Sequence, residues 1–404
     1  MTRFIPAGPL SGTVPAPPSK SMAHRYLICA ALAEGESAVH HLSPSQDILA
    51  TVDCLSALGA TLRWEGDTVY VRGIRAGSSP LAPLDCRECG TTLRLLLPLC
   101  LLGGGEATLV GTERLLSRPL AAYEALCRER GFLWEQVATS VRVCGRLTAG
   151  DYTLPGDVSS QYVSGMLYAL ASVTGNSRIH LTGQIESRSY IDLTLSALAT
   201  FGVSAGWEDG NTLSVTGGQA FSAREVTVEG DWSNAAFWLA WRALGEDLTV
   251  THLSGGSLQG DRACLSCFER LTGEEHPVLS LADCPDLGPV LMAVAALTGG
   301  ATLTDTARLK LKESDRGQAM AAELAKCGVC VTVEENRITV NPTDLHAPTA
   351  PLSGHNDHRI VMALCLLANR LGGGEVTDCE AVRKSYPDFF EQLNSLGIKT
   401  VEKQ

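Results

Sequence analysis

The sequence predicts a repeated α/β fold divided between two lobes, and three observations lead to this prediction. A helix-like apolar pattern, a glycine and a strand–turn–strand pattern recur roughly every 70 residues. The repeat glycines are Gly59, Gly131, Gly202, Gly273, Gly328 and Gly397. A chain of 404 residues is long for one core, so the six units group most simply as three plus three.

The clearest copies of the repeat show why each element is expected. They read LSALGATLRWEGDTVYVRG, LCRERGFLWEQVATSVRVCG, LATFGVSAGWEDGNTLSVTG and LAKCGVCVTVEENRITV. Apolar residues at helical spacing lead to a glycine that can adopt the left-handed helix cap, and two alternating strands follow across a polar turn. The copies around Gly273 and Gly397 match the pattern less well.

The ends of the repeats predict where the chain passes between the lobes. Residues 1–19 are extended and rich in proline, and a helix is expected to begin near residues 19–22. After a predicted strand at 225–229, Asp231 or Ser233 can cap a new helix. The N-terminal lobe is therefore predicted to span 20–228, and the C-terminal lobe to combine 1–19 with 229–404. Both crossings would act as hinges.

The charge balance disfavours two classes of partner. With 32 basic and 44 acidic residues, the formal net charge is −12, which repels nucleic acid and anionic membranes. The start of the chain, MTRFIPAGPL, has no apolar core of signal-peptide type, and the longest apolar runs, 95–102 and 290–297, are too short to span a bilayer. We expect a soluble cytoplasmic protein that binds neither nucleic acid nor membrane.

Fourteen cysteines are dispersed along the chain, and many fall at core-facing positions. In a reducing compartment such residues behave as small hydrophobic side chains. Three C-x-x-C spacings occur, at Cys86/Cys89, Cys264/Cys267 and Cys327/Cys330. A structural zinc site would need two such pairs brought together, so core packing is favoured over a metal site, and a disulfide framework is less favoured still.

The first polar motif, KSMAHR, begins a predicted helix. Lys20 and Ser21 would lie in its first turn, with Arg25 one turn later on the same face. Free backbone N–H groups and the helix dipole already favour an anion there. An ordinary capped helix with solvated cations is the alternative, but this clustering favours an anion site.

A second motif, ECGTTLR, also opens a helix. Gly90 would let a ligand approach the backbone, and Thr91 or Thr92 can cap the helix. Arg94 follows in the helix and Arg118 later, in GTERLLSRPL. The alternative for Gly90 is a plain turn glycine, and Arg94 is equally well explained as structural.

A third motif places two hydroxyls and an amide at a helix start. Ser159, Ser160 and Gln161 form a donor cluster suited to phosphate oxygens, although an N-cap with a spare serine explains them equally well. Ser187 and Arg188 form a similar junction in the next segment.

Two motifs in the second half carry more cations. Lys312 and Arg316 share a helix face with Glu313 beside them, which alone would indicate a salt-bridged surface helix. Asp357 is a natural cap, and Arg359 falls in the first helical turn, where the dipole disfavours a cation. That placement predicts an anionic partner for Arg359 outside its own helix.

Lys384 precedes a Tyr-Pro pair, and Asp286 lies in a loop leading into the buried helix at 290–297. Simple capping is the alternative for Asp286. Taken together, the motifs come from both halves and lie repeatedly at helix starts. We expect a cleft between two lobes to collect them around a strongly anionic small ligand.

At this point the motifs resemble those of one family. PSKSMAHR, CGTTLRLL, the lone Arg118, DVSSQYVSGML, LKESDR, NDHR and RKSYPDFFEQL are similar, in order, to motifs of the 3-phosphoshikimate 1-carboxyvinyltransferase (EPSP synthase) family. The resemblance implies two lobes, each of three βαβαββ-type units with helices inside and sheets outside, an inside-out α/β barrel. It implies transfer of the enolpyruvyl group of phosphoenolpyruvate to the 5-hydroxyl of shikimate 3-phosphate with no metal or organic cofactor. Separately, we expect the protein to be a monomer.

The resemblance also implies roles for individual residues. The positions that match shikimate 3-phosphate contacts are Lys20, Ser21, Arg25, Ser159, Ser160, Gln161, Ser187, Asp286 and Lys312. The positions that match phosphoenolpyruvate contacts are Lys20, Gly90, Arg118, Gln161, Arg316, Arg359 and Lys384. Asp286 matches the general base near the 5-hydroxyl and Glu313 a proton donor to the methylene carbon, with Lys20 as a third catalytic position.

The chain departs from the family pattern at a few positions. Pro18 stands where many members have glycine, Glu88 and Cys89 fill a stretch where many have asparagine, and an asparagine expected near Arg308 is not evident. Two alternatives stay open. The sister enolpyruvyl transferase acting on UDP-N-acetylglucosamine would have Lys-Asn at the first motif, where this chain has Lys20 followed by serine. A non-catalytic anion-binding protein on the same fold is the other.

Overall fold

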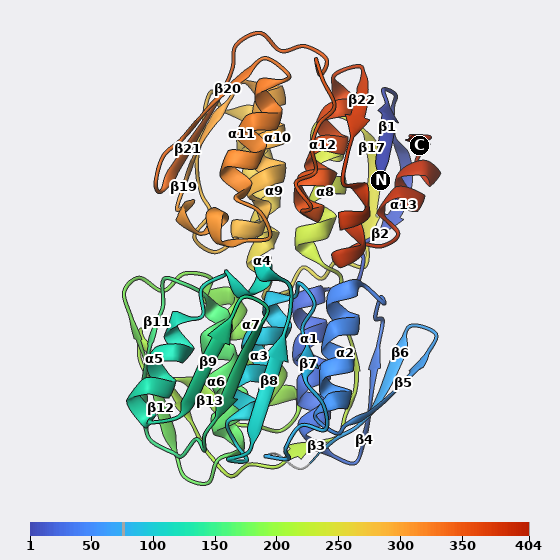
Figure 1. Cartoon of the computed structure of the whole chain (residues 1–404). Helices are drawn as coiled ribbons and strands as arrows, with labels where there is room; N and C mark the ends of the chain where they lie inside the picture. Colours follow the sequence, from blue (N-terminus) through green and yellow to red (C-terminus); the bar gives the residue numbers. More distant parts are fainter. Residues whose placement is uncertain (75–76, 404) are drawn as a thin grey trace. The chain divides into compact units, whose positions relative to one another are not determined.

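The computed structural model describes residues 1–74 and 77–403, and the chain divides into two compact units (Figure 1). Pro18–Glu229 forms one unit, here called the central unit. Met1–Pro17 and Gly230–Gln404 together form the other, here called the terminal unit. Each unit has its own apolar core.

The central unit contains helices α1 to α7 and strands β3 to β16. The helices are α1 (Lys20–Leu32), α2 (Gln46–Ala57), α3 (Gly90–Cys100), α4 (Glu113–Leu116), α5 (Ala121–Arg130), α6 (Ser160–Ser172) and α7 (Arg188–Thr200). The strands are β3 (Ala33–Glu34), β4 (Glu36–His40), β5 (Thr61–Glu65), β6 (Thr68–Arg72), β7 (Leu84–Asp85), β8 (Glu106–Val110), β9 (Leu133–Val137), β10 (Ser140–Cys144), β11 (Asp151–Pro155), β12 (Ser177–Thr182), β13 (Ala205–Trp207), β14 (Thr212–Val215), β15 (Phe221–Ser222) and β16 (Glu225–Thr227).

Three four-stranded sheets in this unit share one topology. Their orders are β16-β4-β6-β5, β7-β8-β10-β9 and β11-β12-β14-β13. In each sheet the first two strands are parallel and the other neighbours are antiparallel. The edge strand β16 comes from the far end of the unit and completes the first sheet, while β15 pairs with β3.

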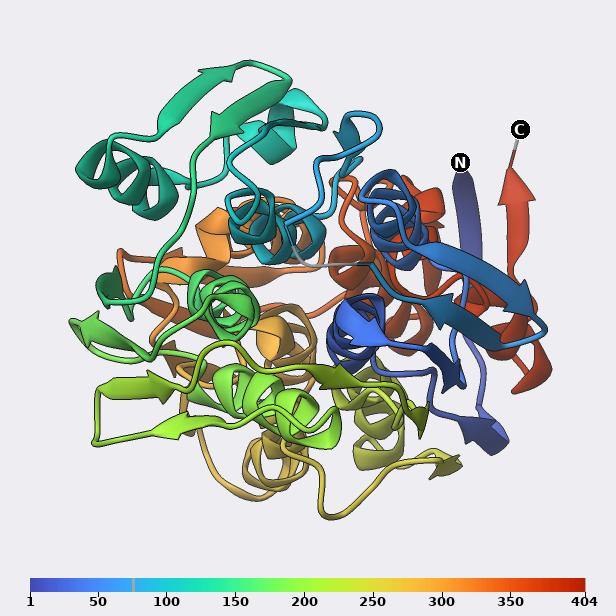
Figure 2. The same cartoon turned by 90° about the horizontal axis from the view of Figure 1, so that it is seen from below.

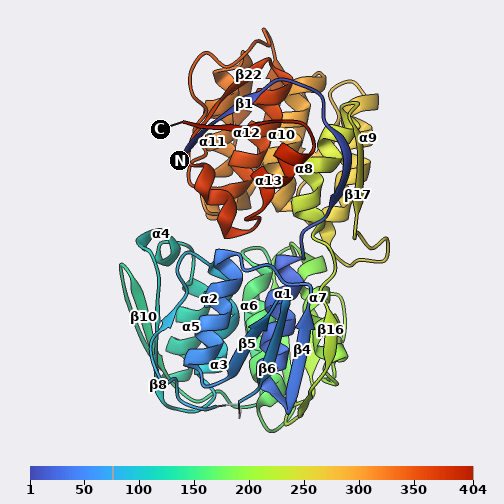
Figure 3. The same cartoon turned by 90° about the vertical axis from the view of Figure 1, so that its right-hand side faces the viewer.

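Five helices of the central unit lie against one another in a closed ring. Neighbouring contacts run α1–α2–α3–α6–α7 and back to α1. Nearly every residue of α3 and α6 is buried, because these helices are apolar on all sides. Figure 3 shows β4, β5 and β6 on the outer side of α1 and α2, and Figure 2 shows the ring of helices nearly end-on.

The terminal unit combines the two ends of the chain. Its strands are β1 (Thr2–Pro6), β2 (Ser11–Pro15), β17 (Asp247–Thr251), β18 (Val278–Ser280), β19 (Ala301–Thr304), β20 (Val329–Val333), β21 (Arg337–Pro342), β22 (Gly373–Val376) and β23 (Val401–Lys403). Its helices are α8 (Trp232–Ala243), α9 (Cys264–Gly273), α10 (Gly288–Thr298), α11 (Arg316–Ala325), α12 (His358–Arg370) and α13 (Phe389–Ser395), with short 3₁₀ turns η1 (Gly260–Ala263), η2 (Pro285–Leu287), η3 (Ala307–Leu311) and η4 (Cys379–Lys384).

Long-range strand pairs close the terminal unit. The sheet β18-β19-β21-β20 repeats the topology of the central unit. The first strand of the chain, β1, lies between β22 and β23, and β2 runs parallel to β17. Helices α8, α10 and α12 are buried and touch one another, with Trp238 and Trp241 stacked in the core at 5.4 Å between ring centroids.

The prediction of a mixed α/β fold is confirmed, and the repeat is confirmed at four positions. Gly59, Gly131, Gly202 and Gly328 all have positive φ and lead into the hairpins β5–β6, β9–β10, β13–β14 and β20–β21. At Gly273 the prediction is wrong. That glycine ends α9 without a left-handed φ and only β18 follows, since the intervening EEHP lacks strand alternation. Gly397 has φ +120° and leads into β23 alone.

Among the described residues, no helix combines the length and the apolar character needed to cross a bilayer.

Replacing Gly328 tests the tightest of these junctions. Its φ is +78°, and an added Cβ would collide with the carbonyl oxygen of Asp344. We expect Gly328→Ala to lower the free energy of unfolding by about 3 kcal/mol in urea denaturation. Gly245→Ala is the matched control, because its φ is +101° with no atom within 4 Å, so it should cost about 1 kcal/mol. Equal losses in the two variants would contradict this account.

Candidate functional site

Several of the polar motifs come together in pairs because the two members of a pair follow neighbouring parallel strands. Gly90 and Arg118 follow β7 and β8, which are parallel, and the motif at Ser159 and the turn at Ser187 follow β11 and β12. The carboxyl ends of parallel neighbours lie at one edge of a sheet, which is where α/β proteins bind ligands. The topology therefore gathers residues that lie far apart in the sequence.

In the central unit, the first turns of neighbouring helices are joined by side chains. Lys20 Nζ lies 2.7 Å from Asp47 Oδ2, which links the starts of α1 and α2. Gln161 Nε2 donates to Thr91 Oγ1 at 2.9 Å, which links the starts of α6 and α3. Because helix N-termini carry partial positive charge, their convergence favours an anion.

Arg25 ties α1 to α7 from a buried position. Its Nε donates to Thr194 Oγ1 at 2.8 Å, its Nη2 to the Tyr190 carbonyl at 2.8 Å and its Nη1 to the Ser21 carbonyl at 2.7 Å. Burial lowers the pKa of Arg25, but a guanidinium starts from so high a value that it stays charged. A permanent positive charge is thus fixed beside Ser21.

Gly90 is required for the position of Arg118. A Cβ at Gly90 would lie 2.8 Å from Arg118 Nη1 and 2.9 Å from its Cζ, so the guanidinium rests on the glycine backbone. The neighbouring Arg94 donates to Gln161 Oε1 at 2.9 Å and to the Pro119 carbonyl at 3.1 Å. Burial, with Arg118 nearby, lowers the pKa of Arg94 to about 10. Arg94 therefore orients Gln161 and the segment that carries Arg118.

The predicted serines lie at the starts of α6 and α7. Ser159 caps α6, since its hydroxyl accepts the Gln161 N–H at 3.3 Å, and Ser160 is the first residue of that helix. Ser187 precedes α7 in the left-handed region with φ +55°. Ser164 in α6 and Thr194 in α7 are hydrogen-bonded at 2.7 Å within the first two turns of their helices, which holds the two starts side by side.

In the terminal unit, Asp286 is surrounded by three cations. Its Oδ1 lies 2.7 Å from Arg316 Nη1 and 3.1 Å from Lys312 Nζ, and its Oδ2 lies 3.3 Å from Arg359 Nη2. Burial alone would raise the pKa of Asp286, but Arg359, Lys312 and Arg316 together hold it well below the ordinary carboxyl value. Asp286 and Arg316 follow β18 and β19, another parallel pair.

Arg316 is the most buried cation of this cluster, with 1% of its side chain exposed. Besides Asp286, it donates to Asp357 through Nε at 2.8 Å and Nη2 at 3.3 Å, and to Glu313 Oε2 at 2.8 Å. Asp357 also accepts from the backbone N–H of Arg359 as the cap of α12. Burial opposes ionisation of Asp357, but Arg316 nevertheless lowers its pKa.

Arg359 lies in the first turn of α12, as expected, and its anionic partner is Asp286. The guanidinium also donates to Ser233 Oγ at 2.9 Å, and Ser233 in turn donates to Asp231 at 2.6 Å at the start of α8. Lys384, at the end of η4, donates to the Asn356 carbonyl at 2.7 Å in the loop before α12. The parallel bridge between Leu352 and Val376 brings these two segments together.

Sequence reasoning missed Glu323, whose side chain is 3% exposed. It accepts from His355 Nε2 at 2.9 Å, from Lys326 Nζ at 2.7 Å and from the Ser353 backbone N–H at 2.7 Å. These bonds hold a turn in which His355 and Asn356 have φ of +50° and +52°, a strained pair of consecutive left-handed residues. Its pairing with Lys326 looks like an ordinary helical ion pair, and nothing local in the sequence indicates its bonds to Ser353 and His355, which lie 30 and 32 residues away.

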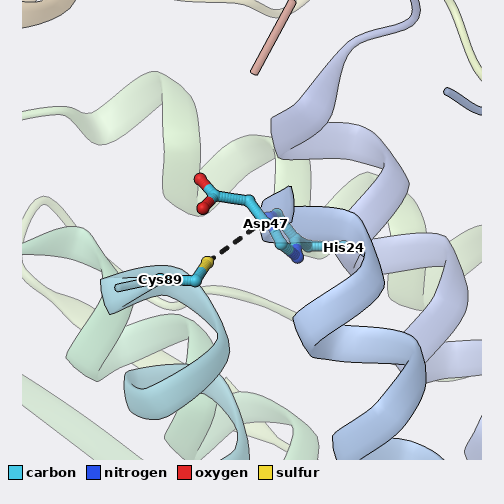
Figure 4. Close-up of side chains that lie close together, drawn as sticks. All are labelled: His24, Asp47 and Cys89. Atoms are coloured by element: carbon cyan, nitrogen blue, oxygen red, sulfur yellow. Dashed lines mark hydrogen bonds between the residues drawn. The ribbon is translucent and has the colours of Figure 1, made fainter. Parts of the chain in front are cut away.

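One group of three metal-ligand side chains occurs among the described residues: His24, Asp47 and Cys89 (Figure 4). It does not use the other cysteine of the Cys86/Cys89 pair. Burial, aided by Lys20 and Arg25, lowers the pKa of His24 well below its usual range, so this imidazole is neutral.

Comparisons with known proteins agree over nearly the whole chain. The family model of EPSP synthase (3-phosphoshikimate 1-carboxyvinyltransferase) matches residues 5–393. The 3-phosphoshikimate 1-carboxyvinyltransferase of Clostridium kluyveri is 35% identical over 410 residues, which cover 96% of this chain and 95% of the relative. The enzyme of that name from Clostridium perfringens strain 13 is 34% identical, with 98% of both chains covered.

Solved structures support the same fold. An EPSP synthase from Acinetobacter baumannii superposes with a TM-score of 0.81 at 24% identity, covering 99% of this chain and all of that one. The enolpyruvyl transferase NikO from Streptomyces tendae gives a TM-score of 0.76 at 18% identity, covering 99% and 98%. The match of family model, relatives and fold shows that the chain belongs to the EPSP synthase family.

Proposed function

We propose that the protein transfers the enolpyruvyl group of phosphoenolpyruvate to the 5-hydroxyl of shikimate 3-phosphate. The products are 5-O-(1-carboxyvinyl)-3-phosphoshikimate and phosphate, a step of aromatic amino acid biosynthesis. Family membership supports this function, and one observation carries the chemistry: Asp286 and Glu313 share one arginine inside a cation cluster. Two anionic substrates need such cations, and the transfer needs an acid and a base beside the reacting bond.

In the central unit, we assign the helix starts to the two anionic groups. Ser159, Ser160 and Ser187 would donate to the phosphate of shikimate 3-phosphate, and Lys20, Ser21 and Arg25 would hold the same substrate. Gln161 would lie between the two ligands. Gly90 and Arg118 would bind phosphoenolpyruvate, because the guanidinium is already held against the glycine backbone.

In the terminal unit, Arg316, Arg359 and Lys384 would bind phosphoenolpyruvate and Lys312 would contact shikimate 3-phosphate. A cation–anion pair at 4 Å is worth about 4 kcal/mol at an effective dielectric of 20, so several cations are needed to desolvate so charged a substrate. The same arginines would stabilise the charge that develops as phosphate leaves.

The bond changes assign an acid and a base. Glu313 would protonate the methylene carbon of phosphoenolpyruvate, which makes the adjacent carbon electrophilic. Asp286 would accept the proton of the 5-hydroxyl as its oxygen attacks that carbon. The tetrahedral adduct then expels phosphate, and a proton is lost from the new methyl group to restore the double bond.

Asp286 is too weak a base while three cations surround it, since they hold its pKa well below the ordinary value. Phosphoenolpyruvate bound on Arg316 and Arg359 would draw these charges toward its own oxygens. The pKa of Asp286 would then rise, so substrate binding itself prepares the base. Asp286 would therefore neutralise the neighbouring cations in the free protein and act as the base in the complex with phosphoenolpyruvate.

Two alternatives are tested by the same assay. Phosphate release from phosphoenolpyruvate is measured first with shikimate 3-phosphate and then with UDP-N-acetylglucosamine. Activity with the sugar nucleotide alone would favour the sister enolpyruvyl transferase. Activity with neither substrate would favour a non-catalytic anion-binding protein.

We further propose that the protein works as a monomer in the cytoplasm. Its exposed large apolar residues fall in separate segments rather than one run, and include Leu81, Val137, Leu265 and Val401. Twelve of the free cysteines are buried, as expected of thiols used for packing in a reducing compartment.

Replacing Arg359 tests the phosphoenolpyruvate assignment. We expect Arg359→Ala to lower kcat/KM by about 100-fold or more, because it removes a cation that meets developing charge. Arg370→Ala, at the other end of α12 where the arginine pairs with Glu246, should stay within about twofold. Circular dichroism checks that both variants are folded. A fully active Arg359→Ala would remove this residue from the site.

The pH dependence tests the role of Asp286. The acid limb of kcat/KM reports the free protein, in which the pKa of Asp286 is depressed, and that of kcat reports the complex. We expect the kcat limb at higher pH than the kcat/KM limb, after correction for ionisation of the substrate phosphates, which is measured separately. Asp286→Asn should lower kcat by about 100-fold or more and abolish the limb. Coincident limbs in the parent protein would contradict the proposed coupling.

Glu323 is assigned as a positioning residue that acts through His355 and Asn356 on Arg359 and Lys384. We expect Glu323→Ala to raise KM for phosphoenolpyruvate more than it lowers kcat, and to cost about 2 kcal/mol of stability. Lys326→Ala removes only the half-buried lysine partner and keeps the bonds to His355 and Ser353, so it should change neither constant by more than about twofold. A loss of stability with unchanged KM would reduce Glu323 to a structural role.

A further inference from the structure

The cluster of His24, Asp47 and Cys89 lies where three helix starts meet in the central unit. His24 is in α1, Asp47 in the first turn of α2, and Cys89 caps α3 by accepting the Thr92 N–H through its sulfur. Cys89 Sγ lies 3.9 Å from His24 Nε2, and the three ligand atoms all lie within 4.8 Å of one another (Figure 4). Residues from three separate segments thus converge on one point.

A chain of hydroxyls fixes the orientation of the imidazole. His24 Nδ1 lies 2.7 Å from Thr51 Oγ1, which lies 2.7 Å from Thr92 Oγ1. With the ring proton on Nδ1, the lone pair of Nε2 points toward Cys89. Metal-binding histidines are typically held in this way, by a hydrogen bond from the nitrogen that does not bind the metal.

We propose that this cluster binds one borderline-soft divalent cation of the zinc class through Cys89 Sγ, His24 Nε2 and an Asp47 carboxylate oxygen. Tetrahedral zinc would place sulfur and nitrogen about 3.6 Å apart, so the observed 3.9 Å needs only a small contraction. The Cys89 thiol loses its proton to solvent as the metal–sulfur bond forms, and water fills the fourth position.

The approach for the ion lies on the Asp47 side. The side chains of Lys20 and Asp47 keep 14% and 12% exposure, whereas His24 and Cys89 have 0% and 2%. The ion must therefore compete with the Lys20 ammonium, which lies 2.7 Å from Asp47. Binding of the ion would displace Lys20 from Asp47. This step rests on the proposed function: because Lys20 is assigned to the substrate, the ion would inhibit turnover.

Cobalt(II) is the probe for binding, because a thiolate ligand gives an ultraviolet charge-transfer band and tetrahedral geometry gives intense visible bands. The full-length reduced protein is titrated without oxygen and without substrates. We expect the protein to bind cobalt at one site and to show both the ultraviolet charge-transfer band and the intense visible bands. Cys89→Ser keeps a capping oxygen on α3 and should weaken binding by about 100-fold or more, since loss of even an outer-shell partner costs up to about that much. Cys330→Ser, which removes an exposed thiol of the terminal unit, should leave the spectrum unchanged.

The outcomes separate the proposal from adventitious binding. Absence of the charge-transfer band, or a band that persists in Cys89→Ser, would overturn the site.

The effect on turnover is measured in a second experiment. For the parent protein and for each variant, the rate with zinc is compared with the rate of the same protein without zinc. Inhibition in the parent protein that is lost in Cys89→Ser supports displacement of Lys20, and a loaded but uninhibited protein would refute that displacement. The cobalt spectrum does not depend on the proposed reaction, so failure of one is distinguishable from failure of the other.

Discussion

The direction of the strands is the constraint on which the polar cluster in each unit depends. In four sheets a parallel pair is followed by helices or turns that start at the same edge. Gly90 and Arg118, or Asp286 and Arg316, become neighbours only because their preceding strands run side by side in one direction. An antiparallel pair would send the two loops to opposite ends of the sheet. The pairing of the backbone strands therefore sets which side chains can meet.

The buried charges of the terminal unit are stable only as a set. Desolvating Arg316 or Asp357 alone would cost several kcal/mol, but each has a charged partner within hydrogen-bond distance. The depressed pKa values of Asp286 and Asp357 mean that their stabilising contribution is present above about pH 4, the ordinary carboxyl value, and is lost as the pH falls toward the folded-state value. The same network holds the cations ready for an anionic ligand without the cost of leaving them unpaired.

Much of this arrangement could be predicted from the sequence, and the exceptions share a cause. Local signals marked the helix start at Lys20, the cap at Asp357 and the out-of-place cation at Arg359. The hairpin predicted after Gly273 does not form. A helix pattern followed by a glycine does not specify a hairpin unless residues with strand-like alternation come next. The contacts of Glu323 with His355, of Arg94 with Gln161 and of His24 with Cys89 could not be predicted, because each joins residues far apart in the chain. Such pairs depend on tertiary packing, and a single sequence does not display it.

The pairing of the first strands has a consequence for how the chain is made. β1 lies between β22 and β23, and β2 pairs with β17, so both strands are synthesised long before the strands they pair with. The first sheet of the central unit likewise stays incomplete until β16 is synthesised. Nascent β1 and β2 must therefore remain unpaired while some hundreds of residues are translated, at roughly 5–20 residues per second. The central unit can fold before these partners exist, whereas the sheet around β1 in the terminal unit can close only after β22 and β23 have been synthesised.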